Sequence, residues 1–194
     1  MVDYDASTGL VVVDVQNDFA DPTGSLFVQG GDAAVPRINE EIERAAAGAA
    51  LLVYTQDWHP LSTPHFAKDG GIWPVHCVAG SWGARLHPSL VVAGPLIRKG
   101  SNGEDGYSGF TMRDPGTGEE RPTELEETLR ERGVTRLAIC GLATDYCVRS
   151  TVLDACRLGF DTMVLTDAVA AVELAPGDAA SALAEMAAAG AQLI

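Results

Sequence analysis

The sequence predicts an α/β fold, a three-layer α/β/α sandwich around a mainly parallel sheet of about six strands. Short apolar runs bounded by polar residues alternate with longer segments in which apolar residues recur every three or four positions. The first pattern is typical of strands buried on both faces, and the second of amphipathic helices. Their alternation favours a parallel sheet covered by helices. Because the chain has 194 residues, 46% of them hydrophobic, we expect a single domain over residues 1–194.

Six apolar runs are the expected strands, and they lie at residues 10–13, 51–54, 96–97, 137–140, 163–165 and 193–194. In open parallel sheets, ligands bind outside the carboxyl ends of the strands. Four polar features of different chemistry follow these runs: Asp14, Asp57, Lys99 and the turn at 141–147. We therefore expect them to meet at one edge of the sheet.

Four segments are the expected helices, and they lie at residues 33–49, 123–132, 144–158 and 178–189. Glycine directly follows the second, third and fourth of them, which is a typical stop signal. Two stretches, 58–89 and 100–121, do not fit the alternation and are rich in Gly, Pro and aromatic residues. Loops of this length in a compact domain are usually functional or disordered.

Charge and composition exclude several classes of function. Thirteen basic and 27 acidic residues give a net charge of −14, which disfavours binding to nucleic acid or to an anionic membrane. The first ten residues carry no basic residue, unlike a secretory signal, and no apolar run approaches the ~20 residues of a membrane helix. Four cysteines in a chain this long do not make a disulfide framework. We expect a cytoplasmic protein that acts on a small molecule.

Cys147 is the candidate nucleophile. It lies in the first turn of the helix expected to begin near Thr144, a good N-cap residue. Free backbone N–H groups and the positive end of the helix dipole are expected to lower the pKa of its thiol and to hold a developing oxyanion. The alternative is a buried structural thiol, which is our interpretation of Cys77, Cys140 and Cys156.

A thiol nucleophile needs a base, and Asp14 is the candidate. It directly follows four apolar residues, where desolvation raises the pKa of a carboxyl toward values useful for proton transfer. Lys99, at another strand end, would balance a carboxylate and a thiolate held close together. Asp14, Lys99 and Cys147 are therefore the candidate catalytic triad.

Three of the four histidines, His59, His65 and His76, lie within eighteen residues. Asp57 and His59 are two positions apart, so that in an extended segment both can face one ion. One carboxylate with up to three imidazoles suits a divalent transition metal such as Zn²⁺, Fe²⁺ or Mn²⁺, with zinc the first candidate. The alternative is a polar loop with hydrogen-bonded histidines.

Aromatic residues accompany these candidates along the chain. Phe19 follows Asp14, Trp73 lies in the histidine-rich stretch and Tyr107 in the second long loop. They could line a flat apolar slot for a ring, or they could anchor the loops in the core.

Five motifs occur in a specific order: D-V-Q-N-D-F with Asp14, D-W-H at 57–59, W-P-V-H-C at 73–77, Lys99-Gly100, and G-L-A-T-D-Y-C-V at 141–148. In order and spacing the chain resembles the nicotinamidases, members of the isochorismatase-like cysteine hydrolases with their Rossmann-like fold. The resemblance covers nearly the whole chain, from residue 11 to residue 170.

The resemblance implies roles for these residues. It makes Cys147 the nucleophile, Asp14 the acid–base and Lys99 the third catalytic member. It implies a cis peptide between Leu142 and Ala143 that would aim the N–H groups of Ala143 and Cys147 into an oxyanion hole. The implied metal ligands are Asp57, His59, His65 and His76, and the implied substrate-binding residues are Phe19, Trp73, Tyr107 and Leu142.

The complete Asp/His set favours nicotinamide as substrate, with its ring nitrogen on the metal. The implied reaction converts nicotinamide to nicotinic acid and ammonia through a thioester, a step of NAD salvage. One alternative is a sister hydrolase of another carboxamide, an N-carbamoyl compound or isochorismate; another is a metal-dependent binding module without turnover. The sequence leaves open the metal's identity, a homo-oligomeric state, the role of Tyr146 and whether His65 is a direct ligand.

Overall fold

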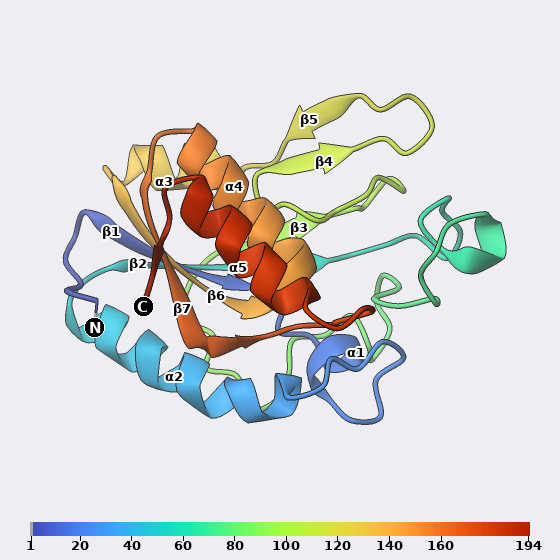
Figure 1. Ribbon diagram of the computed structural model, residues 1–194, viewed down its shortest axis with the longest axis horizontal. Helices are drawn as coiled ribbons and strands as arrows, with labels where there is room; N and C mark the ends of the chain where they lie inside the picture. Colours follow the sequence, from blue (N-terminus) through green and yellow to red (C-terminus); the bar gives the residue numbers. More distant parts are fainter. Residues whose placement is uncertain (1) are drawn as a thin grey trace.

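The computed structural model describes residues 2–194 and contains a six-stranded parallel sheet flanked by helices (Figure 1). Its strand order is β3-β2-β1-β6-β7-β8, and every neighbouring pair is parallel. The strands are β1 (Thr8–Val13), β2 (Leu51–Asp57), β3 (Leu96–Lys99), β6 (Arg136–Leu142), β7 (Asp161–Ala170) and β8 (Gln192–Leu193). The expected sheet and its six strands are confirmed.

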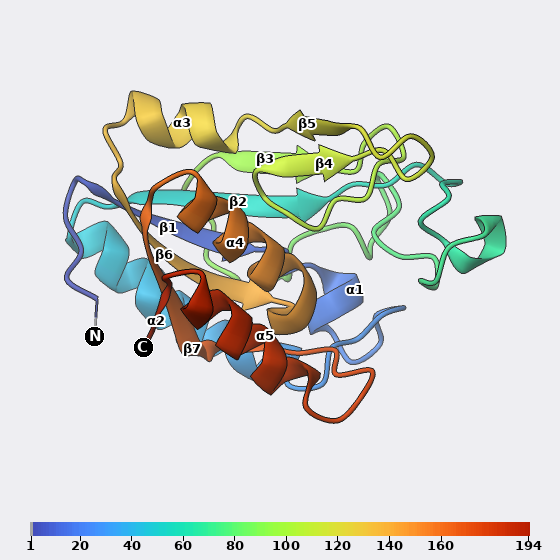
Figure 2. The ribbon, with the colours of Figure 1, turned by 45° about the horizontal axis from the view of Figure 1, so that its top comes forward.

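Helices cover both faces of the sheet, which explains the continuous apolar run of β1. Leu10 and Val12 pack on the face of α2 (Gly31–Ala47). Val11 and Val13 pack on the opposite face with α3 (Leu125–Glu131), α4 (Arg149–Arg157) and α5 (Asp178–Ala188). Figure 2 shows α4 and α5 in front of the sheet and α2 behind it. The three-layer arrangement is confirmed, with helix ends within a few residues of those expected.

The register of the central strands brings the site residues to one edge. Asp57 at the end of β2 pairs with Lys99 at the end of β3, and Val13 at the end of β1 pairs with Gly141 of β6. Asp14, the residue after Val13, therefore lies at this edge of the sheet, between the end of β2 and the turn that leads from β6 to Cys147. The expected convergence of polar strand ends follows from this register.

The two long stretches outside the alternation contain short elements. A single turn, α1 (Asn17–Ala20), follows β1, and η1 (Ala67–Asp69) is a 3₁₀ turn in the stretch after β2. In the second stretch, β4 (Thr111–Arg113) pairs antiparallel with β5 (Glu120–Pro122), where the sequence analysis expected only loop. Figure 1 shows this hairpin outside the main sheet. Among the described residues, no helix is long and apolar enough to span a membrane.

Candidate active site

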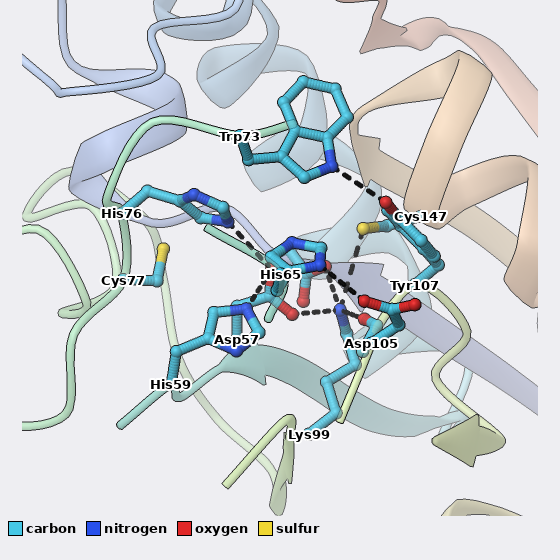
Figure 3. A network of polar contacts seen from close by, with 12 residues as sticks. Asp57, His59, His65, Trp73, His76, Cys77, Lys99, Asp105, Tyr107 and Cys147 are labelled. Atoms are coloured by element: carbon cyan, nitrogen blue, oxygen red, sulfur yellow. Dashed lines mark hydrogen bonds and ion pairs between the residues drawn. The ribbon is translucent and has the colours of Figure 1, made fainter. Parts of the chain in front are cut away.

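Asp14, Lys99 and Cys147 meet in the interior, at the carboxyl edge of the sheet. The Lys99 Nζ lies 2.6 Å from the Oδ2 of Asp14 and 3.7 Å from the Sγ of Cys147. The same ammonium group donates to the carboxylate of Asp57 and to the carbonyl of Gly106 (Figure 3). Lys99 and Asp14 are fully buried and Cys147 is 7% exposed. A single buried cation thus contacts two carboxylates beside the thiol, which leaves one negative charge in excess when both are ionised.

The backbone and one neighbouring hydroxyl fix the position of the Asp14 carboxylate. Asp14 has φ +48°, a left-handed conformation that is uncommon for residues other than glycine. Its amide donates to the Thr55 Oγ1 at 3.2 Å, and that hydroxyl donates to the Asp14 Oδ1 at 2.6 Å. Thr55 lies within β2, and the sequence pattern of this strand does not predict its hydrogen bond to Asp14.

Burial governs the protonation of the pair formed by Asp14 and Cys147. It raises the pKa of Asp14 to about 6 even though Lys99 opposes the shift, in the direction expected from the sequence. It also raises the pKa of the Cys147 thiol well above its usual value, against the lowering that we expected. The expectation was wrong because desolvation, together with the carboxylates of Asp14 and Asp57, outweighs the attraction of Lys99. Burial therefore favours the neutral form of the Cys147 thiol, which lies beside the Asp14 carboxyl group.

The turn that carries Cys147 differs from the expected start of an α-helix. Residues Thr144–Val148 form a π-helical turn, η2, which continues into α4. The N–H of Val148 donates to the carbonyl of Ala143 five residues back, at 3.0 Å, which is the π-helical pattern. The peptide bond between Leu142 and Ala143 is cis, as the resemblance implied.

A second cluster brings together His59, His65 and His76. One nitrogen of each ring lies within 4.8 Å of a nitrogen of the others, and all three side chains are buried. The Oδ2 of Asp57 lies 3.6 Å from the Nε2 of His59 and 3.9 Å from the Nε2 of His76. The structure thus gathers the four implied metal ligands, with His65 in the group (Figure 3).

The hydrogen bonding of this cluster suits a divalent cation. Both ring nitrogens of the fully buried His59 lack a hydrogen-bond partner among the described residues, a costly arrangement unless a ligand completes it. Burial lowers the pKa of His76 to about 4, which keeps its imidazole neutral. The Nδ1 of His76 donates to the carbonyl of Pro74 at 2.8 Å, leaving its Nε2 free. Three imidazoles and a carboxylate are a donor set that fits zinc.

An aromatic pocket connects the histidine cluster to the thiol. Its lining comprises Phe19, Leu26, Val28, Asp57, His65, Trp73, His76, Gly106, Tyr107, Ala143, Tyr146, Cys147 and Val172. The Nε1 of Trp73 donates to the hydroxyl of Tyr107 at 2.8 Å, and the ring of Tyr146 stands edge-on to Trp73 at 4.8 Å. The slot expected from Phe19, Trp73 and Tyr107 is therefore present.

One expected substrate residue lies elsewhere. Leu142 is fully buried in the core and is not among the lining residues, because its side chain packs toward Gly31 of α2. The resemblance implied a substrate contact for Leu142, but its side chain packs on the face of the sheet that α2 covers. The sequence analysis in turn missed Leu26, Val28 and Val172, apolar residues of ordinary loops whose sequence carries no signal of the pocket.

Replacing Thr55 with valine should shift the acid limb of the pH profile to higher pH. The hydroxyl bond to Asp14 favours the carboxylate, so that its loss raises the pKa of Asp14 further. A hydrogen bond worth about 0.5–1.5 kcal/mol corresponds to up to about one pH unit. The measurement is kcat/KM as a function of pH between pH 5 and 8. Thr162→Val is the matched control, since it removes a buried hydroxyl of β7 that donates to the carbonyl of Phe160. An equal shift in both variants would contradict the role of Thr55.

Comparison with known proteins identifies the family. A match to the isochorismatase domain covers residues 8–194. A nicotinamidase of Escherichia coli is 39% identical over 95% of this chain and 92% of its own length. The structure of a pyrazinamidase of Pyrococcus horikoshii in complex with zinc has a TM-score of 0.86 and 40% identity, covering 97% of this chain and 98% of that one. The structure of PnC1 from L. infantum in complex with nicotinate has a TM-score of 0.89 and 36% identity, covering 100% and 95%. The chain belongs to the isochorismatase domain family.

Proposed function

We propose that this chain hydrolyses nicotinamide to nicotinate and ammonia, a step of NAD salvage. The observation that carries the proposal is one pocket whose walls hold aromatic side chains, two members of the histidine cluster (His65 and His76) and the buried thiol of Cys147. A planar pyridine fits between aromatic side chains, and its carboxamide would face Cys147. The similar proteins named as nicotinamidases, and the relative that holds nicotinate, support the same substrate.

The reaction begins with proton transfer within the triad. Asp14 accepts the proton of the Cys147 thiol, and the sulfur attacks the carboxamide carbon. Because the pKa of the thiol is raised, we expect this transfer to accompany the attack rather than precede it. The N–H groups of Ala143 and Cys147 are the proposed donors to the oxyanion. Lys99 keeps a counter-charge beside Asp14 throughout, because its ammonium is held by two carboxylates.

In the second half of the reaction, Asp14 gives up the proton that it accepted from the thiol. Asp14 returns the proton to the leaving nitrogen, ammonia departs, and a thioester remains on Cys147. Asp14 then takes a proton from a water molecule as the water oxygen attacks the thioester carbon. The C–S bond breaks, Asp14 returns the proton to the sulfur of Cys147, and the product acid loses its own proton to solvent and leaves as nicotinate. One buried carboxyl with a pKa of about 6 can serve in both directions near neutral pH.

The residues that would hold a metal are Asp57, His59, His65 and His76, and zinc is the first candidate among divalent metals. When bound, the metal supplies a Lewis-acidic position for the nitrogen of the pyridine ring. Within the chain, Lys99 binds one oxygen of Asp57, so that the other faces His59 and His76. We also place the enzyme in the cytoplasm, because its four cysteines are free.

The test is ammonia release from nicotinamide, with isochorismate and N-carbamoyl compounds as competing substrates. We expect nicotinamide to be hydrolysed with the highest kcat/KM. Faster turnover of another substrate would assign the chain to a sister hydrolase, and turnover of none would favour a binding module.

Removal of the metal with a chelator should reduce kcat/KM for nicotinamide by about 100-fold or more, because several kcal/mol of binding and polarisation are lost. Added Zn²⁺ should restore the activity. His59→Ala should show the same loss of kcat/KM, and added Zn²⁺ should not restore its activity. His87→Ala is its matched control, since His87 lies in a turn where it accepts a bond from the Ser89 N–H at 3.3 Å. Normal nicotinate binding by a chelated, metal-free sample would contradict a metal contact to the ring.

A further inference from the structure

Three consecutive residues, Asp105, Gly106 and Tyr107, contact three different parts of the site. The Oδ1 of Asp105 lies 2.7 Å from the Nδ1 of His65. The carbonyl of Gly106 accepts a hydrogen bond from Lys99, and the hydroxyl of Tyr107 accepts one from Trp73. Figure 3 shows Asp105 in contact with His65, and Tyr107 in contact with Trp73. The segment therefore connects the histidine cluster, the triad and the aromatic slot.

The backbone of Asp105 is itself fixed by the hairpin outside the main sheet. Its N–H donates to the carbonyl of Arg113 in β4 at 2.7 Å, and the N–H of Arg113 donates back at 3.1 Å. β4 in turn pairs with β5. Two backbone hydrogen bonds to β4 thus hold Asp105 in place beside His65. The side chain of Asp105 is 23% exposed, and that of His65 is 4% exposed.

The contact decides which nitrogen of His65 can bind a cation. A carboxylate only accepts hydrogen bonds, so that the proton of the imidazole stays on Nδ1 and the lone pair of Nε2 stays available. A carboxylate behind a ligating imidazole also fixes the orientation of the ring and increases its basicity as a ligand. Removing such a partner from metal sites typically weakens metal binding by about 10- to 100-fold.

We propose that Asp105 is a positioning residue of the metal centre, which holds His65 in the tautomer and orientation that bind a divalent cation. The proposal rests on the metal site of the proposed function. The proposal also makes the β4–β5 hairpin part of that site, because β4 holds the backbone of Asp105 through two hydrogen bonds.

Metal affinity is the direct test, measured on metal-free protein by competition with a chromophoric chelator for Zn²⁺ and Co²⁺. We expect Asp105→Ala to weaken binding by about 10- to 100-fold. Asp105→Asn keeps an acceptor oxygen and should lose less. The Co²⁺ absorption spectrum should also change in Asp105→Ala, because one ligand is no longer held in place. Glu120→Ala and Glu120→Gln are the controls, since they remove an exposed carboxylate from the same hairpin, and they should bind as the wild type does.

A double-variant cycle with His65→Ala separates positioning from simple charge attraction. If Asp105 acts through His65, Asp105→Ala should cost little or nothing further in the His65→Ala background. An equal loss in both backgrounds, or wild-type affinity of Asp105→Ala, would overturn the proposal. Circular dichroism of the metal-free variants checks their folding. Wild-type protein that binds no cation would contradict the metal site itself, whereas normal wild-type binding with an unaffected Asp105→Ala variant would contradict only the role of Asp105.

Discussion

Cys147→Ala will lose amide hydrolysis by about 10⁴-fold or more, the scale seen when a covalent nucleophile is removed. The side chain is the only sulfur that the structure places against Lys99, within the described residues, and it lines the pocket. No neighbouring group can replace the thiol as the nucleophile, because Asp14 and Lys99 form an ion pair with each other. Ammonia release from nicotinamide at saturating concentration measures the loss, and thermal unfolding shows whether the fold persists.

Cys156→Ala is the matched control for this variant. Cys156 is half-buried on α4, nine residues after Cys147, and its removal should leave turnover within about twofold of the wild type. Iodoacetamide should inactivate the wild type in proportion to alkylation of Cys147, and nicotinamide should protect it. Activity of Cys147→Ala within tenfold of the wild type would rule out this thiol as the nucleophile.

The central sheet and the convergence of the triad could be predicted from the sequence. Parallel strands buried on both faces require continuous apolar runs, and Val11 and Val12 show why, since they face opposite helical layers. Once such strands are assigned, their carboxyl ends must meet, which places Asp14, Asp57 and Lys99 together. The β4–β5 hairpin could not be predicted in this way, because strands of three residues with charged side chains carry no apolar alternation.

Contacts between distant residues account for what the sequence analysis missed at the site. Thr55 and Asp105 act on Asp14 and His65 across 41 and 40 positions, and nothing in their local sequence marks them. The direction in which the pKa of the Cys147 thiol is shifted also depends on tertiary structure. A helix start favours a thiolate, but the depth of burial and the two carboxylates, which decide the outcome, are set only when the strands assemble.

Asp14→Asn is expected to lower kcat/KM by about 10²- to 10⁴-fold, the usual contribution of a general acid–base. The amide keeps the size of the carboxyl group but cannot accept the proton of Cys147 or return it to the leaving nitrogen. Asp5→Asn is the matched control, because Asp5 is exposed just before β1 whereas Asp14 directly follows it. The control should hydrolyse nicotinamide at the wild-type rate.

The pH profile of the wild type gives an independent test of the same residue. Asp14 must be ionised to accept the thiol proton, and its pKa is raised to about 6. Below that pH a growing fraction of Asp14 carries a proton, so kcat/KM should fall about tenfold per pH unit, and above it should level off. Asp14→Asn should lose this limb in its residual activity, while Thr55→Val should move it upward. A wild-type profile that stays flat from pH 7 to pH 5, or a limb unchanged in Asp14→Asn, would show that another group carries the proton.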